Sequence, residues 1–366
     1  MKICHLTSVH PRYDTRIFYK ECVSLANANN DVMLVVADGL GDEQKNGVSI
    51  LDVGKLPGRL NRILKTTRRV LAKAVVLDAD IYHIHDPELL PAGVKLRSMG
   101  RRVIFDAHED VPKQILGKPY LNRFTKLFLS VVLKAYEGWA CSRMSGVIAA
   151  TPYIRDKFSK INAKVVDINN FPMVDELAVG EIDWSKKKDQ VCYVGGIAEI
   201  RGISEIVQAM ESVEGNTRLL LGGTFTSEEF ERKVSGCSGW KRTDAPGFLS
   251  RDQVKDALYR SRAGLVTLHP AINYLDALPV KMFEYMAAGI PVIASNFPLW
   301  EEIISRADCG ICVDPLKPSE IALAISQLAG DSERAAQMGL NGRKAVFDKY
   351  NWGVEEQKLL SFYAAL

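Results

Sequence analysis

The sequence predicts an α/β protein with two doubly wound, Rossmann-type domains in tandem. Short segments rich in Val and Ile alternate with amphipathic helical patterns, as expected for parallel sheets covered by helices on both faces. The alternation is interrupted at Phe171-Pro172 and the polar stretch 180–189, so we expect one domain over 1–171 and another over 172–351. Ligands of such sheets bind beyond the carboxyl ends of the strands. The predicted site is therefore a cleft in which the two sheets face each other.

The composition excludes several classes of protein. The 366 residues are enough for two ordinary domains, and contents of 47% hydrophobic and 25% charged residues exclude a disordered or fibrous chain. Apolar runs are too short for a membrane span. Met1-Lys2 leads into a strand pattern rather than a signal peptide, and the seven cysteines are too scattered for a disulfide framework. We therefore expect a cytoplasmic protein.

The first half contains the strands and helices of one such domain. The stretch 17–29 follows the first strand and places its apolar residues on one helix face. The expected strands are 2–8, 31–37, 81–85, 103–107, 146–149 and 164–168.

The second half repeats this alternation. Its last stretch, 352–366, is helical in pattern and is a candidate to pack back on the first domain. The expected strands are 191–194, 218–221, 264–267, 291–294 and 310–313, and the expected helices are 203–213, 251–260, 280–288, 318–329 and 331–350.

A glycine turn follows the first strand of the second half. Neither domain has G-x-G-x-x-G after its first strand, which argues against a nicotinamide-dependent dehydrogenase. Gly195-Gly196 nevertheless lets the backbone approach a phosphate near a helix N-terminus. Arg201, at that helix start, has a guanidinium suited to a diphosphate. A plain turn with a surface arginine is the alternative.

The stretch 268–295 carries the densest signal. Asp276 and Glu284 are separated by seven residues, and the two oxygens of a carboxylate such as Glu284 can accept both hydroxyls of a ribose. Lys281 lies in the first turn of the expected helix, where a cation is unfavourable unless an anion binds nearby. The pattern thus predicts an anionic ligand, with an ordinary amphipathic helix as the alternative.

Several of these motifs together resemble glycosyltransferase family 4, whose members are retaining enzymes with the GT-B fold. The stretch 268–295 resembles the E-x7-E element of that family, and the turn 193–202 resembles its glycine turn. Residues 105–110 and 80–86 resemble its strand-end histidine regions. The opening loop 10–16 is similar to that of bacterial polysaccharide and O-antigen transferases. The resemblance covers nearly the whole chain and implies two Rossmann-like GT-B domains.

The resemblance implies a role for individual residues. Glu284 would hold the nucleotide ribose, and Asp276 would contact the donor sugar. Arg201 would neutralise the diphosphate, and His108 would lie beside the reacting sugar. The implied catalytic residues are His108, Asp276 and Glu284, the donor-binding residues are Gly195, Gly196, Arg201, Leu249, Leu278, Lys281 and Glu284, and the acceptor-binding residues are His10, Arg12, Asp14 and Arg16.

Three positions depart from the family pattern. Asp276 is one methylene shorter than the usual Glu, which shifts or weakens its contact with the sugar. Gly196 replaces an arginine, and 277–279 replaces a glycine-rich turn with one whose proline has no N–H. We expect Lys281 to supply the missing positive charge.

The function implied is transfer of a hexosyl or N-acetylhexosaminyl group from a nucleoside-diphosphate sugar, UDP being the expected nucleotide. The acceptor would be a glycan hydroxyl, linked to a polyprenyl diphosphate, in lipopolysaccharide or other cell-surface polysaccharide synthesis. The mechanism would need neither a metal nor a cofactor. The alternatives are a non-hydrolysing sugar-nucleotide epimerase, a nicotinamide oxidoreductase and a catalytically silent sugar-nucleotide binder.

Two basic amphipathic segments indicate a surface partner. The first half is net basic and the second net acidic, and residues 55–73 contain seven Lys or Arg and no acidic residue. Segments 55–73 and 120–139 both carry basic and apolar faces, which suit an anionic membrane surface at the inner face of the plasma membrane. A core-packed helix with a solvated basic face is the alternative. Aromatic residues do not interleave with the basic ones, so nucleic acid is not expected.

Three further patterns are weak metal motifs. The D-x-D at 78–80 precedes a strand instead of following it, so we expect a structural turn there. The C-x-x-C at 309–312 has no second pair. His83 and His85 alternate on one strand without a third ligand at suitable spacing, so we expect them in the core and along the cleft. The sequence predicts no metal site.

Overall fold

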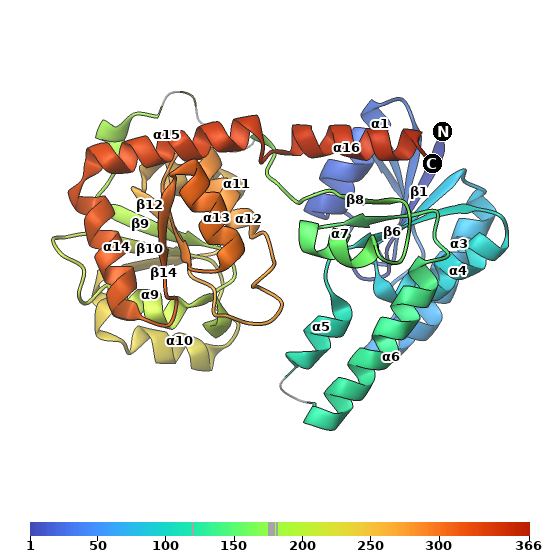
Figure 1. Ribbon diagram of the computed structural model, residues 1–366, viewed down its shortest axis with the longest axis horizontal. Helices are drawn as coiled ribbons and strands as arrows, with labels where there is room; N and C mark the ends of the chain where they lie inside the picture. Colours follow the sequence, from blue (N-terminus) through green and yellow to red (C-terminus); the bar gives the residue numbers. More distant parts are fainter. Residues whose placement is uncertain (119–120, 175–179, 181) are drawn as a thin grey trace. The chain divides into compact units, whose positions relative to one another are not determined.

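The chain forms two compact units, which are each described separately (Figure 1). The computed structural model describes residues 1–118, 121–174, 180 and 182–366. Unit 1 comprises Met1–Asn170 and Gly353–Leu366, and unit 2 comprises Phe171–Trp352. Two of the expected features extend outside the described residues. The second basic segment loses its first residue, 120, and the region of the expected linker loses residues 175–179 and 181.

Unit 1 is built on an eight-stranded sheet of order β3-β4-β2-β1-β5-β6-β7-β8. All neighbouring strands are parallel except β3 and β4. The six strands expected in this half are all present. The strands are β1 (Lys2–Leu6), β2 (Asp31–Val36), β3 (Glu43–Lys45), β4 (Val48–Asp52), β5 (Ile81–Ile84), β6 (Arg102–Ala107), β7 (Gly146–Ala149) and β8 (Val165–Asp167).

The helices of unit 1 include two stretches of π-helix. The expected helix 17–29 is a π-helix followed by a short α-helix, and the expected basic segment 55–73 is helical from residue 59 onward. None of the helices that the structure describes combines the length and apolar character needed to cross a membrane. The helices are η1 (Thr15–Cys22), α1 (Val23–Asn27), α2 (Arg59–Asn61), η2 (Arg62–Thr66), α3 (Thr67–Leu77), η3 (Pro87–Leu89), α4 (Leu90–Ser98), α5 (Val111–Leu116), α6 (Arg123–Cys141), α7 (Pro152–Phe158) and α16 (Trp352–Ala364).

The terminal helix α16 packs on unit 1. The Tyr363 hydroxyl lies 2.8 Å from Nδ1 of the buried His83, and the backbone N–H of Asn169 donates to the Glu355 carboxylate at 2.7 Å. Gly146 on β7 makes room for the ring of Phe362, which would lie 2.6 Å from a Cβ at that position. These contacts explain why the last residues belong to the first sheet rather than to the unit that precedes them.

Unit 2 is built on a six-stranded parallel sheet of order β11-β10-β9-β12-β13-β14. Along β9, Val191 and Tyr193 enter one hydrophobic core while Cys192 enters another, so both faces of the sheet are covered. All five expected strands are present. The strands are β9 (Gln190–Val194), β10 (Arg218–Gly222), β11 (Thr243–Gly247), β12 (Ala263–Val266), β13 (Val292–Ser295) and β14 (Gly310–Val313).

Helix α12 is held tightly against this sheet. The ring of Tyr285 lies over Gly264, where a Cβ would come within 2.3 Å of it, and the Val194 N–H donates to the Tyr285 hydroxyl at 3.2 Å. This contact fixes the first turn of α12 next to the end of β9. The helices of unit 2 are η4 (Trp184–Lys186), η5 (Glu199–Arg201), α9 (Ile203–Ala209), α10 (Glu228–Ser235), η6 (Ser238–Arg242), α11 (Arg251–Arg260), α12 (Val280–Ala287), α13 (Pro298–Ala307), α14 (Pro318–Gly330) and α15 (Ser332–Asp348).

Candidate active site

In unit 1, polar side chains gather beyond the carboxyl ends of β1, β5 and β6. His10 follows β1, Asp86 follows β5, and His108 follows β6. His10 Nε2 lies 3.4 Å from Asp86 Oδ1, and the rings of His10 and His108 are 5.1 Å apart. Neighbouring parallel strands end at the same edge, which is where ligands of such sheets bind. The edge therefore presents two partly exposed imidazoles over a buried carboxylate.

Asp106 anchors this edge from inside the sheet. Its buried carboxylate accepts two hydrogen bonds from the Arg16 guanidinium, at 2.9 and 2.8 Å, and lies 2.9 Å from His108 Nε2. Burial raises the pKa of Asp106, but the charge of Arg16 and the contact with His108 outweigh it and hold the pKa well below its usual value. An ionised Asp106 orients the His108 ring and leaves its other nitrogen for a ligand.

His10 of the opening loop has a partly exposed side chain. Burial lowers the pKa of His10, but the hydrogen bond to Asp14 and the charges of Asp86 and Asp14 raise it above the usual value overall. Asp14 also caps η1 by accepting hydrogen bonds from the N–H groups of Arg16 and Ile17, both at 2.9 Å. Asp14 thus positions His10 and starts the helix.

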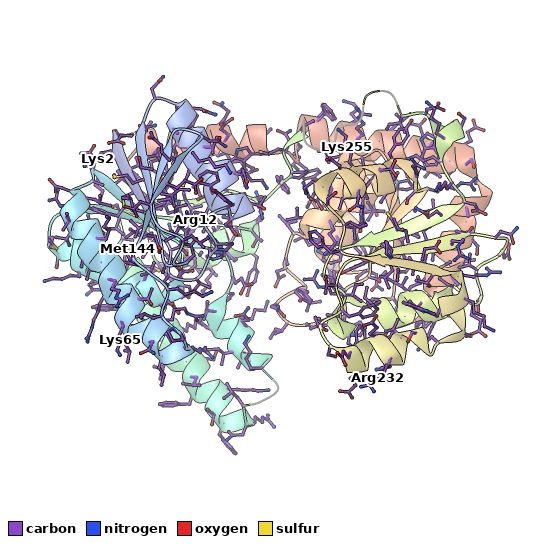
Figure 2. The ribbon with its side chains drawn as sticks, turned by 180° about the vertical axis from the view of Figure 1, so that it is seen from behind. Lys2, Arg12, Lys65, Met144, Arg232 and Lys255 are labelled. Carbon is purple, nitrogen blue, oxygen red and sulfur yellow. The ribbon has the colours of Figure 1, made fainter. Side chains whose placement is uncertain are left out.

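Arg12 and Arg16 of the opening loop are held by contacts within the fold. The Arg12 side chain is 7% exposed and forms a bidentate ion pair with Asp38, at 2.7 and 2.8 Å. The Arg16 side chain is 5% exposed and, besides Asp106, donates to the Ile168 carbonyl at 2.7 Å. Both residues thus have a structural role, and their acceptor-binding role stays a prediction. Arg12 is labelled in Figure 2.

His83 and His85 are buried, as expected of core residues, and the fold brings further side chains of metal-ligating type beside them. His5 pairs with His83 across β1 and β5, and Glu21 of η1 completes a buried group whose donor atoms lie within 4.8 Å of one another. His5 Nδ1 lies 2.9 Å from His85 Nε2, and Arg16 Nε lies 3.1 Å from Glu21 Oε1. Burial lowers the pKa of His5 and of His83, so these rings are neutral in the core.

In unit 2, the glycine turn and the first turn of α12 are brought together. Gly195 has a φ of 137°, and a Cβ there would lie 2.3 Å from Cε of Lys281. Burial, together with the nearby charge of Arg201, lowers the pKa of Lys281 to about 8, while Glu284 opposes the shift. Arg201 and Lys281 thus bring two positive charges to one space, which suits a phosphate or diphosphate ligand.

Arg201 and Lys281 line a pocket of about 270 Å³ within unit 2. Tyr193 and Tyr274 add aromatic walls, and Pro279 lies at the start of α12. Lys281 Nζ lies 5.2 Å from the centre of the Tyr193 ring. We call this space the donor pocket.

The remaining donor-binding candidates surround the donor pocket without lining it. Glu284 is one turn further along α12 and lies 3.4 Å from Arg251 of α11. Leu249 packs against Gly222 at the end of β10, where a Cβ would lie 2.4 Å from Cδ1. Leu278 packs on a hydrophobic core. The partly buried Asp276 and the exposed Gly196 complete the set.

Sequence reasoning missed several residues of these two sites. Asp86 lies two residues after β5, and Asp106 is the second-last residue of β6. Their position at strand ends was a signal that the sequence offered. Tyr193, one residue before the end of β9, carried the same signal. Tyr274 and Arg251 had no such signal, because they reach the site through contacts between distant elements.

Substitution Gly195→Ala tests the contact between the turn and Lys281. The change should lower the free energy of unfolding by about 1–3 kcal/mol, because alanine is strained at this φ and its Cβ displaces Lys281. UDP binding should weaken in parallel. Thermal denaturation and calorimetric titration with UDP measure both effects. Gly330→Ala, where no atom lies within 4 Å of the added Cβ, should change neither.

The lowered pKa of Lys281 predicts a pH-dependent affinity for UDP. Lys281 loses its proton as the pH rises through about 8, so UDP binding should weaken from about pH 7 to about pH 9. The free energy of unfolding of the free protein should instead rise with pH above about 8. The reason is that Lys281 is still protonated in the unfolded chain at a pH at which it has lost its proton in the folded protein. Calorimetric titrations across this range test both signs. Lys281→Met should abolish the pH dependence; an unchanged profile in this variant would contradict the assignment.

Comparisons with known proteins cover both units. The family described as Glycosyltransferase Family 4 matches residues 16–171, and that described as Glycosyl transferases group 1 matches residues 176–345. A glycosyltransferase of Methanocaldococcus jannaschii is 25% identical, over 91% of this chain and 88% of its own length. A GDP-mannose-dependent α-(1-6)-phosphatidylinositol monomannoside mannosyltransferase of Mycobacterium tuberculosis is 27% identical over 44% of each chain.

One solved structure gives the fold of the whole chain. Anabaena HepE in complex with UDP-glucose has a TM-score of 0.75 and 16% identity, with 100% of both chains covered. The family resemblance read from the sequence is therefore confirmed. The chain belongs to the family 4 glycosyltransferases and has the GT-B fold.

Proposed function

We propose that this glycosyltransferase moves a sugar from a nucleoside-diphosphate donor, with UDP as the nucleotide, to a glycan hydroxyl with retention of configuration. The observation that carries the proposal is the convergence of Arg201 and Lys281 on one pocket beside Gly195. Both are cations, and the turn leaves backbone free to approach a phosphate. The UDP-glucose complex of the structural neighbour HepE supports a donor of this class.

In the proposed reaction, Arg201 and Lys281 stabilise the charge that develops on the departing diphosphate. Glu284 accepts hydrogen bonds from the ribose hydroxyls, and Asp276 contacts the donor sugar. The bond between the anomeric carbon and the diphosphate oxygen breaks as the acceptor oxygen attacks from the same face. The departing phosphate takes the acceptor proton. His108 is held by Asp106 and orients the donor sugar. The proposal therefore requires the donor sugar to contact His108 during turnover.

The proposal includes a lipid-linked glycan acceptor, bound through unit 1, in cell-surface polysaccharide synthesis. The name of the mycobacterial relative describes a lipid-bearing acceptor, which supports this part. The basic and apolar faces of 55–73 and 121–139 support contact with an anionic membrane at the cytoplasmic face. No metal takes part in the proposed chemistry, because protein cations neutralise the diphosphate.

A transfer assay with a panel of nucleotide sugars tests the proposal. We expect release of nucleoside diphosphate that depends on the acceptor, persists in EDTA, and yields a product with the donor's anomeric configuration by NMR. Isomerised nucleotide sugar without acceptor would indicate an epimerase instead. UDP binding without turnover over the acceptor panel would indicate a silent binder.

A further inference from the structure

Unit 1 contains a groove that the donor chemistry does not use. It has a volume of about 720 Å³ and lies among residues of α2, η2, α3, α4 and α6. Its walls are largely aliphatic. They include Ile63, Leu64, Leu71, Leu90 and Leu133. We call it the α3–α6 groove.

One end of the α3–α6 groove reaches the edge of the unit 1 sheet that carries His10, Asp86 and His108. Val9, Asp86 and Glu88 line it there, and Asp86 lies 3.4 Å from His10. The Ser8 N–H and the Thr7 hydroxyl both donate to Asp86 and hold it in place, at 2.6 and 2.9 Å. A ligand that filled the groove would therefore place its head group next to His10.

The groove also offers positive charge to an anionic ligand. Arg59, Arg62 and Arg68 line it, and so do the acidic residues Asp86, Glu88, Glu109 and Glu137. Three of these carboxylates have cationic or imidazole partners, since Glu88 pairs with Arg62, Glu137 with Lys157 and Asp86 with His10. The exposed Arg59 and Arg68 form no ion pair with any residue that the structure describes, so their charges are available to a ligand. Aliphatic walls with two such arginines match an apolar chain that carries a phosphate or diphosphate.

Exposed apolar side chains surround the groove. Leu60 and Leu64 on α2 and η2 are 76% and 56% exposed, and Phe124 and Phe128 on α6 are 86% and 67% exposed. The first turns of α6 extend past the other helices of unit 1 in both views (Figures 1 and 2). Such a concentration of exposed apolar groups marks a surface that contacts lipid or protein.

We propose that the α3–α6 groove binds the isoprenoid chain of a lipid-diphosphate acceptor, with the arginines at its opening on the diphosphate and the glycan at His10. This rests on the proposed function and adds the location and chemistry of acceptor recognition. The groove thereby selects lipid-linked over free glycans, because a free glycan leaves the aliphatic walls without an apolar partner.

The test measures binding of farnesyl diphosphate and of inorganic pyrophosphate, without any sugar nucleotide. We expect wild-type protein to bind farnesyl diphosphate about tenfold or more tightly than pyrophosphate, because the chain buries apolar area. Leu64→Asn and Leu133→Asn should each remove about tenfold of the farnesyl diphosphate affinity and leave that for pyrophosphate unchanged. Leu40→Asn, at an exposed leucine outside the groove, is the matched control and should have no effect.

Two results would overturn the proposal. One is equal affinity of wild-type protein for the two probes, which needs no variant. The other is tight binding of farnesyl diphosphate that neither groove variant weakens, since this would place the isoprenoid chain outside the groove. UDP binding is measured separately on the same samples. Its loss would reject the proposed function, whereas loss of farnesyl diphosphate binding alone rejects only the acceptor groove.

Discussion

Substitution His108→Ala is expected to lower kcat by roughly 10²–10³-fold, with a much smaller change in the donor KM. The expected loss is large because His108 is held rigidly by the buried Asp106 carboxylate, at 2.9 Å, and its ring is partly exposed at the sheet edge. A group pre-oriented in this way acts mainly on the transition state. Steady-state kinetics with variable donor concentration separate kcat from KM.

The control for this variant is UDP binding measured by calorimetry. Because His108 belongs to unit 1 and the donor pocket to unit 2, the dissociation constant for UDP should equal that of the wild type. Thermal denaturation should show an intact fold. Wild-type turnover in His108→Ala would show that this edge of unit 1 does not take part in the reaction.

Removal of either cation of the donor pocket should weaken UDP binding strongly. Arg201→Ala and Lys281→Ala should each raise the dissociation constant by about 10- to 100-fold, the usual effect of losing a charge-assisted hydrogen bond of about 1.5–3 kcal/mol. The Lys281 variant should also gain stability, because it removes a desolvated amine that lies beside Arg201. Calorimetric titration and thermal denaturation measure the two effects.

Matched variants separate a local effect from loss of net charge. Arg232→Ala on α10 and Lys255→Ala on α11 each remove one positive charge from unit 2; Arg232 is exposed and Lys255 is partly exposed (Figure 2). These two variants should leave UDP binding unchanged. If they weakened UDP binding as much as Arg201→Ala and Lys281→Ala do, net charge rather than the donor pocket would attract the nucleotide.

The sequence was most informative where local patterns decide the structure. The eleven expected strands are all present, and helix 280–288 is found at Val280–Ala287. The hairpin of β3 and β4 was missed although Asn46-Gly47 is a strong turn signal, and both residues adopt positive φ, 51° and 76°. Strand β11, with the sequence TDAPG, has little strand propensity and forms through pairing with β10.

The candidate site was predictable where residues follow strand ends and not where distant segments meet. Arg16 and Asp106 are 90 residues apart, so no local pattern revealed that the guanidinium is buried against that carboxylate. The ion pair of Arg12 with Asp38 was hidden for the same reason, since Asp38 follows a different strand. By contrast, the positive charge of Lys281 in the first turn of a helix was visible in the sequence and predicted an anionic ligand there, and the structure places this side chain against Gly195.

A crystal structure with bound UDP tests the central claim most directly. The account predicts the diphosphate in the donor pocket, with its oxygens about 3 Å from the Arg201 guanidinium and from Lys281 Nζ, and backbone of the Gly195 turn against it. UDP bound elsewhere, with Arg201 and Lys281 both turned toward solvent, would contradict the account.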